Sequence, residues 1–188
     1  MIYNGNINDT TDFKSEKAFY VNSCGTTHTC SEFSVIREFG RNDYHILYVI
    51  KGNCYIEKES SIITLEENDI FIYYPHEMQK YSFDSKENIS YWIHFSGYEV
   101  ENLLTQLNLT AGKHHLNEFN NISALFNSIQ KEYSAYSIIN DETNQKAKIL
   151  RIKNGGLLIE LLSNICLSIN CIGDKEISSK FIDDVNRF

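Results

Sequence analysis

The chain has 188 residues, of which 42% are hydrophobic and 22% are charged, a composition typical of a folded domain and unlike that of disordered or fibrous chains. Its 17 lysines and arginines face 25 acidic residues, which gives a formal net charge of -8 at pH 7. A nucleic-acid surface needs clustered positive charge to displace counterions, so we expect no direct contact with DNA or RNA by these residues alone.

The cysteines and the apolar runs predict the compartment. The five cysteines form no CxxC pair and leave an odd thiol, so we expect reduced thiols and no disulfide framework. The first residues lack a basic segment followed by an apolar run, and no stretch reaches the roughly 18 apolar residues of a membrane span. The predicted location is the cytoplasm, without a membrane partner.

From residue 19 to residue 97, short runs of Ile, Val, Tyr and Phe alternate with polar or glycine-containing breaks. This pattern is typical of short antiparallel strands, and their spacing favours a sandwich or a barrel. Gly52 and Asn53 indicate a turn, and Pro75 ends a strand because proline has no N–H to donate. We predict strands at 33–39, 44–51, 54–58, 62–66, 69–74, 79–83 and 89–95.

After residue 97 the apolar residues recur at three- and four-residue steps, which predicts amphipathic helices at 99–107, 121–136 and about 142–169. Gly155 and Gly156 interrupt the last helix. Each glycine costs about 1 kcal/mol relative to alanine in a helix interior, so the pair indicates a kink or the close approach of another backbone. Strands followed by helices predict an α+β chain whose helices flank a β-barrel.

The strand predicted at 89–95 carries candidate binding chemistry. Its two-residue period places Ser90, Trp92 and His94 on one face and an apolar set on the other. A ring that supplies contact area beside a few placed donors suits a cavity for a small polar molecule. Filling of the barrel interior by Trp92 is the alternative, and the chemistry of the residues leaves both open.

Arg37 lies on the strand predicted at 33–39 and could point inward among apolar neighbours. A guanidinium there needs a carboxylate or hydroxyl partner, which a ligand could supply. An internal ion pair with Glu32 or Glu38 is the alternative.

The segments REFGRNDYHILYVIKGN, LEENDIFIYYPHEMQKY and ISYWIHFSG, which lie between Arg37 and Gly97, form the most specific pattern in the chain. Together they resemble the amino-terminal cupin domain of AraC-family transcriptional regulators. The resemblance implies a cupin-like antiparallel β-barrel (double-stranded β-helix or jelly roll) followed by flanking helices. It also implies an effector-sensing and dimerising role, with no enzyme activity, no cofactor and no bound metal.

The resemblance implies a ligand site inside the barrel. In the family's sugar-responsive member, residues that match Arg37, Tyr81 and Trp92 help to hold the effector. Ser90 stands where that member has a histidine, so another sugar, a sugar acid, a different small polar molecule or no ligand at all stays open. The full expected ligand-binding set is Arg37, Tyr81, Trp92, His45, Ser90, His94 and Thr26.

The resemblance also divides the chain. It implies a polar arm at 1–18, the barrel at 19–97, a helical dimerisation region at 98–172, and at 173–188 a linker with the start of a helix-turn-helix domain that is otherwise missing. We expect DNA contact only through that missing domain. The apolar stripe of the last helix exceeds what a small barrel can cover, so we expect it to pair two copies. The expected dimerisation residues are Leu150, Leu157, Leu161 and Ile165.

Two alternatives remain at this point. The first is a metal-dependent cupin enzyme, but the expected His-x-His is reduced to His45 beside Leu47, and Gln79 replaces a later histidine. Glutamine is a poor transition-metal ligand, and adjacent strand residues such as His114 and His115 point to opposite faces. The second alternative is a dimerisation module that binds no ligand.

Overall fold

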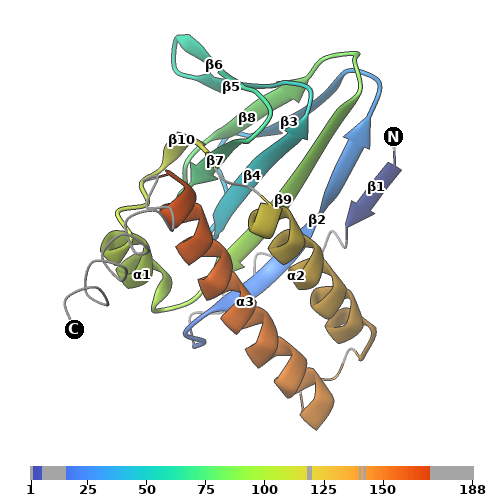
Figure 1. Ribbon diagram of the computed structural model, residues 1–188, viewed down its shortest axis with the longest axis vertical. Helices are drawn as coiled ribbons and strands as arrows, with labels where there is room; N and C mark the ends of the chain where they lie inside the picture. The colour runs from blue at the N-terminus through green and yellow to red at the C-terminus, as the bar shows by residue number, and fades with distance from the viewer. Residues whose placement is uncertain (1, 6–15, 118–119, 140, 142, 170–188) are drawn as a thin grey trace, which may run out of the picture.

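The computed structural model describes residues 2–5, 16–117, 120–139, 141 and 143–169. Its strands form two antiparallel sheets, and its helices lie beside them (Figure 1). In chain order the elements are β1 (Ile2–Gly5), β2 (Tyr20–Thr29), β3 (Phe33–Arg37), β4 (Tyr44–Lys51), β5 (Cys54–Lys58), β6 (Ser61–Leu65), β7 (Asp69–Tyr73), β8 (Gln79–Phe83), β9 (Asn88–Ser96), α1 (Val100–Gln106), β10 (Gly112–His115), α2 (Asn120–Ile139) and α3 (Gln145–Ile169).

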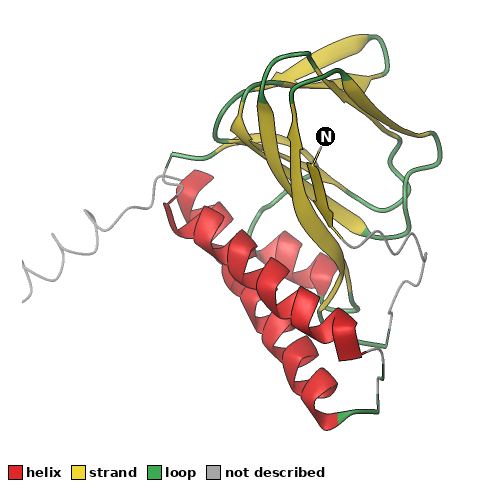
Figure 2. Ribbon diagram, turned by 90° about the vertical axis from the view of Figure 1, so that its right-hand side faces the viewer, coloured by secondary structure: helices red, strands yellow, loops and turns green. Residues whose placement is uncertain are grey.

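The two sheets face each other and enclose the interior of the barrel (Figure 2). The six-stranded sheet has the order β1-β2-β9-β4-β7-β10, and the four-stranded sheet has the order β3-β8-β5-β6. Neighbouring strands that are distant in sequence, such as β4 and β9, show that the chain crosses between the sheets rather than forming a simple meander. The prediction of an α+β fold with a cupin-like antiparallel barrel and flanking helices is confirmed.

Strand alternation gives the six-stranded sheet two different faces. One face packs against the helices and forms a helix-side core, which includes Ile46, Tyr48, Ile72, Ile93, Phe95, Phe126, Ile129, Leu158, Leu161, Leu162 and Ile165. The other face meets the four-stranded sheet and forms an inner core, which includes Leu47, Val49, Cys54, Ile56, Leu65, Phe71, Tyr73, Tyr81, Phe83 and Trp92. The inner core has fewer residues than the helix-side core, and buried polar side chains such as His45, Gln79 and Ser90 lie beside it.

Helices α2 and α3 run side by side and pack against β2 of the six-stranded sheet (Figures 1 and 2). Helix α3 continues through both glycines. A Cβ atom on Gly155 would lie 3.2 Å from the carbonyl oxygen of Phe19, whereas one on Gly156 would meet no atom within 4 Å. Close approach of another backbone therefore explains Gly155, and the predicted alternative of a kink is not needed.

Helix α3 is long and apolar enough, by composition alone, to cross a membrane. Four of its large apolar residues, however, lie in the helix-side core: Leu158, Leu161, Leu162 and Ile165. A helix that buries this face against a sheet behaves as a core helix of a globular domain.

The predicted strands 44–51, 54–58 and 79–83 have the observed bounds, and the other predicted elements differ only near their ends. Three strands were not predicted: β1, β2 and β10. Strand β2 has the polar sequence YVNSCGTTHT. Its polar side chains make hydrogen bonds: Thr26 donates to Gln130 of α2, and Asn22 accepts from Ser96 of β9. The sequence of β2 therefore shows no apolar alternation. Residues 170–188, which include the predicted start of a helix-turn-helix domain, lie outside the described residues.

Candidate ligand-binding site

Two histidines lie face to face on the inner surface of the six-stranded sheet. His45 of β4 and His94 of β9 are register partners, and their ring centroids are 4.1 Å apart with an interplanar angle of 15°. Trp92 lies on the same surface, and its ring centroid is 5.9 Å from that of His94. Ser90 is the next inward residue of β9 and is fully buried. Strand alternation thus brings these four side chains to the inside of the barrel.

Asp43, which immediately precedes β4, is a buried carboxylate at the centre of a polar network. Arg41 donates to both of its oxygens, from Nε at 2.9 Å and from Nη2 at 3.0 Å. His94 Nδ1 lies 3.2 Å from Oδ1, and Asn22 Nδ2 donates to Oδ2 at 2.9 Å. Burial opposes ionisation of Asp43, but the hydrogen bonds from His94 and Arg41 outweigh it and lower the pKa of the carboxyl.

The same network fixes the state of His94. Burial lowers its pKa, and the attraction of Asp43 only partly opposes this effect. A neutral imidazole that faces an ionised carboxylate through Nδ1 carries its proton on Nδ1, which leaves Nε2 as an acceptor.

His45 is fully buried. Its ring stacks between His94 and Tyr73, and the Tyr73 ring centroid is 5.5 Å away at an interplanar angle of 8°. Burial and the positive charges of Arg37 and Arg41 hold the pKa of His45 well below its ordinary value. Neither ring nitrogen has a hydrogen-bond partner within the described part of the chain. The neutral ring therefore presents one unused donor and one unused acceptor.

Arg37 reaches the same interior from the opposite sheet. It pairs in register with Gln79 of β8, and its Nη1 donates to Gln79 Oε1 at 2.9 Å. Gln79 is fully buried, and its Nε2 has no hydrogen-bond partner among the described residues. The predicted alternative, an ion pair of Arg37 with Glu32 or Glu38, is absent from the ion pairs that join described residues.

Two tyrosines complete the inner surface. Tyr81 of β8 lies with its ring centroid 6.1 Å from that of His45 and 6.4 Å from that of Tyr73. The Tyr73 hydroxyl is buried and finds no partner in the described ranges. Burial raises the pKa of Tyr73, so the hydroxyl keeps its proton and can donate or accept.

Thr26 is the one expected ligand-binding residue that the structure places elsewhere. It is the register partner of Tyr91, on the helix-facing side of the sheet, and its hydroxyl donates to Gln130 Oε1 of α2 at 3.1 Å. Its neighbours Gly25 and Thr27 pair with the inward residues Trp92 and Ser90. The expectation for Thr26 is corrected accordingly, because the alternation of β2 turns it away from the barrel interior.

Sequence reasoning missed several polar residues of this site. Gln79 shares a face of β8 with Tyr81, which was proposed as inward, so the two-residue period of that strand could have found it. No residue of β7 had been proposed as inward, so nothing pointed to Tyr73. Arg41 and Asp43 lie before a strand, where no period applies, and their partner His94 is distant in sequence. Only the fold brings them together.

A hollow of about 190 Å³ reaches the end of the inner core, lined by Ile56, Glu57, Lys58, Glu59, Tyr73, Glu77 and Met78. One wall is the turn around Glu77, against which the 38–41 loop packs closely. A Cβ atom on Gly40 (φ 64°) would lie 2.2 Å from the carbonyl oxygen of Glu77, so only glycine allows this approach. Of the polar residues described above, Tyr73 is the one that lines this hollow.

The positions of the His, Cys, Asp and Glu side chains do not indicate a metal site in the described part of the chain. Within the described ranges, no group of three or more His, Cys, Asp or Glu side chains is gathered closely enough to hold a metal ion. The stacked rings of His45 and His94 present their faces to each other, not converging lone pairs.

The expected dimerisation residues divide between two environments. Leu161 and Ile165 are fully buried in the helix-side core, so the expectation that they face a second copy is wrong. Leu150 and Leu157 are half-buried. The apolar side chains that α3 does expose are Ile149, Ile152 and Leu167.

The sequence model of the family described as "AraC-like ligand binding domain" matches residues 23–155. Similar solved structures include a cupin-2 domain containing protein from Shewanella frigidimarina, with 18% identity, coverage of 38% of this chain and 67% of that chain, and a TM-score of 0.32. The Schizosaccharomyces pombe Cnp3 cupin domain has 12% identity, coverage of 45% and 57%, and a TM-score of 0.36.

An HTH_3 family transcriptional regulator from Vibrio cholerae has 6% identity, coverage of 44% of this chain and 45% of that chain, and a TM-score of 0.35. No curated protein matches the chain. The family match spans more than half of the sequence and contains the described inner-surface residues from Arg37 to His94. The chain therefore belongs to the family of AraC-like ligand binding domains.

Proposed function

We propose that the chain is the effector-sensing and dimerising domain of an AraC-family transcription factor in a bacterial cytoplasm. A small polar molecule of the sugar type binds between the two sheets. Sequence-specific DNA binding belongs to a helix-turn-helix domain beyond the described residues, which this domain controls. The protein carries out no chemical reaction on the effector.

The proposal is supported most directly by polar atoms inside the barrel that find no hydrogen-bond partner among the described residues. They are both ring nitrogens of His45, Tyr73 Oη, Gln79 Nε2 and Ser90 Oγ. Leaving a buried donor or acceptor unpaired costs about 1–3 kcal/mol. Four such side chains, three on the six-stranded sheet and Gln79 on the other, indicate a place that a polar guest completes, and the Trp92 indole offers a flat apolar wall.

A thermal-shift screen of sugars and small polar acids tests the proposal. We expect at least one compound to raise the melting temperature of the wild-type domain, because a ligand that binds only the folded state stabilises it. Arg37→Ala and Trp92→Ala should reduce that rise, and Lys86→Ala, a change in an exposed turn, should not. A compound that stabilises all four proteins equally would place its site outside the barrel.

Dimerisation is proposed through the outer side of the helical pair. Ile152 on α3 is 72% exposed and Ile138 on α2 is 83% exposed. On α3, Ile149, Ile152 and Ile159 recur at steps of three and seven residues, a spacing that suits helix pairing. A second copy of the chain would remove this apolar surface from water, and two-fold pairing is the commonest way to do so.

A further inference from the structure

The inner surface carries an excess positive charge, although the chain as a whole has a net charge of -8. Asp43 neutralises Arg41 through two direct contacts. Arg37, in contrast, has a neutral amide as its partner, and none of the ion pairs that join described residues includes it. Since His45 and His94 are neutral when buried and Asp43 is paired with Arg41, the described residues of this surface supply no separate counter-charge for the guanidinium of Arg37.

The unused hydrogen-bonding groups beside Arg37 are mainly donors. Gln79 Oε1 accepts from Arg37, which fixes the orientation of the amide and leaves Nε2 as a buried donor without a partner among the described residues. A guanidinium has five N–H donors and no acceptor. A hydroxyl of a ligand would need an acceptor for its own proton, whereas an ionised carboxylate accepts only. This corner of the site therefore matches a carboxylate.

The rest of the surface has a different character. His45, Ser90 and Tyr73 each offer a donor and an acceptor that the described residues leave unused. Groups of this kind suit hydroxyls, which both donate and accept. The two regions adjoin, because Tyr81 follows Gln79 as the next inward residue of β8 and its ring centroid is 6.1 Å from that of His45.

We infer that the effector is a small hydroxy acid of the sugar-acid class, whose carboxylate binds Arg37 and Gln79 and whose hydroxyls face His45, Ser90 and Tyr73. This inference rests on the proposed function, since it names the class of molecule that the same site receives. Three acidic side chains line the hollow. Glu77 pairs with Lys58 at 3.6 Å, Glu57 pairs with Lys80, and Glu59 is exposed to solvent.

Matched pairs of probes that differ in a carboxylate test the inference. We would measure, by calorimetry, the affinities of D-glucuronate and D-glucose, D-galacturonate and D-galactose, and D-gluconate and D-glucitol. In at least one pair the acid should bind about tenfold or more tightly than its neutral partner, because a charge-assisted hydrogen bond contributes more than a neutral one.

Three variants test whether the positive charge of Arg37 causes the preference for the acid. Arg37→Gln should lower the affinity for the acid about tenfold and change that for the neutral partner little. Arg37→Lys keeps the charge and should keep the preference for the acid. Arg151→Gln removes an arginine from α3, outside the barrel, and should change neither affinity.

Three results are decisive. A preference for the acid that Arg37→Gln abolishes supports the inference. Neutral compounds that bind as tightly as their acids in every pair that binds, or an equal effect of Arg37→Gln on both members of the preferred pair, overturn the inference and leave the proposed sensing function intact. Failure of all six compounds to bind overturns the inference and, with it, the sugar-type effector of the proposed function.

Discussion

At the scale of single residues, the protonation states of the buried histidines set how the domain responds to pH. His45 is neutral in the folded barrel because burial lowers its pKa well below the ordinary value. In the unfolded chain it takes up a proton below about pH 6.5. The unfolded state then binds more protons, so the free energy of unfolding falls as the pH falls.

We predict that His45 makes the wild-type domain lose about 1.4 kcal/mol of unfolding free energy between about pH 7.5 and 5.5. His45→Phe removes this group and should flatten the dependence by that amount, as measured by urea denaturation at each pH. Asp43 has a lowered pKa, so its stabilising contribution is lost only below about pH 4, outside this window.

The exposed His76 (φ 66°) provides the control for this experiment. Asparagine tolerates positive φ, so His76→Asn should leave the pH dependence unchanged. Identical slopes for the wild type and His45→Phe would mean that His45 is not held neutral inside the barrel.

Residue-scale reasoning from sequence found part of the site. The two-residue period placed Ser90, Trp92 and His94 on one face, and the structure has them there. The side chain of Arg37 needed the family resemblance, because an isolated strand arginine pairs equally well with a nearby glutamate. The ion pair of Arg41 with Asp43 could not be predicted, since its position depends on how a loop meets β9.

At the scale of elements, a row of hydrogen bonds joins β2 to α2. Tyr20 Oη lies 3.1 Å from Tyr136 Oη, and the Tyr133 hydroxyl donates to the carbonyl oxygen of Asn22 at 2.6 Å. Asn22 lies at a register shift in β2, and its side chain bonds to Asp43. One residue thus touches both the binding surface and the helical pair.

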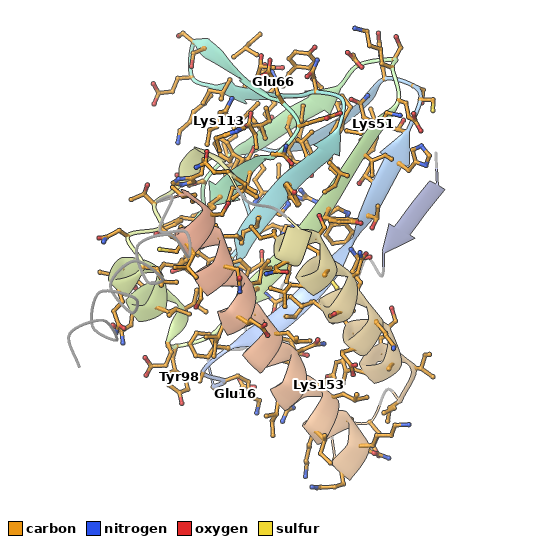
Figure 3. The ribbon with its side chains drawn as sticks, viewed as in Figure 1. Glu16, Lys51, Glu66, Tyr98, Lys113 and Lys153 are labelled. Atoms are coloured by element: carbon orange, nitrogen blue, oxygen red, sulfur yellow. The ribbon has the colours of Figure 1, made fainter. Side chains whose placement is uncertain are left out.

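We predict that Tyr133→Phe lowers the free energy of unfolding by about 1 kcal/mol, because a hydrogen bond to a partly buried carbonyl is lost while the ring is kept. Urea denaturation measures the change. Tyr98→Phe is the matched control, since Tyr98 is 62% exposed (Figure 3). If the two variants lose equal stability, the contact between Tyr133 and Asn22 contributes nothing.

Elements whose apolar residues recur at a regular spacing could be predicted from the sequence, and the polar strand β2 could not. The 3.6-residue period located α2 and α3 to within a few residues. Helix α3, however, is apolar on more than one side, so sequence could not tell which side packs on the sheet. Leu161 and Ile165 were assigned to a partner and lie in the core instead.

At the scale of the whole molecule, the helical pair forms one layer beside the barrel (Figure 2). Lys153 of α3, which Figure 3 labels, forms an ion pair with Glu132 of α2 at 2.7 Å. We predict that the domain sediments as a dimer and that Ile152→Asp yields a folded monomer. Leu161→Asp should instead unfold the domain, because it buries a charge in the helix-side core.

Lys86→Asp introduces the same aspartate in an exposed turn outside the helices and should leave the dimer unchanged. A dimer that persists in Ile152→Asp would remove this side of α3 from the proposed interface.

Trp92 offers the most direct test of the central claim, that a small polar effector binds between the two sheets. It is the only tryptophan in the chain, so a ¹H–¹⁵N spectrum shows a single indole signal. When the compound that most raises the melting temperature is titrated, the account predicts that this signal shifts and yields the same Kd as calorimetry. Saturable binding by calorimetry with an unmoved indole signal would contradict it.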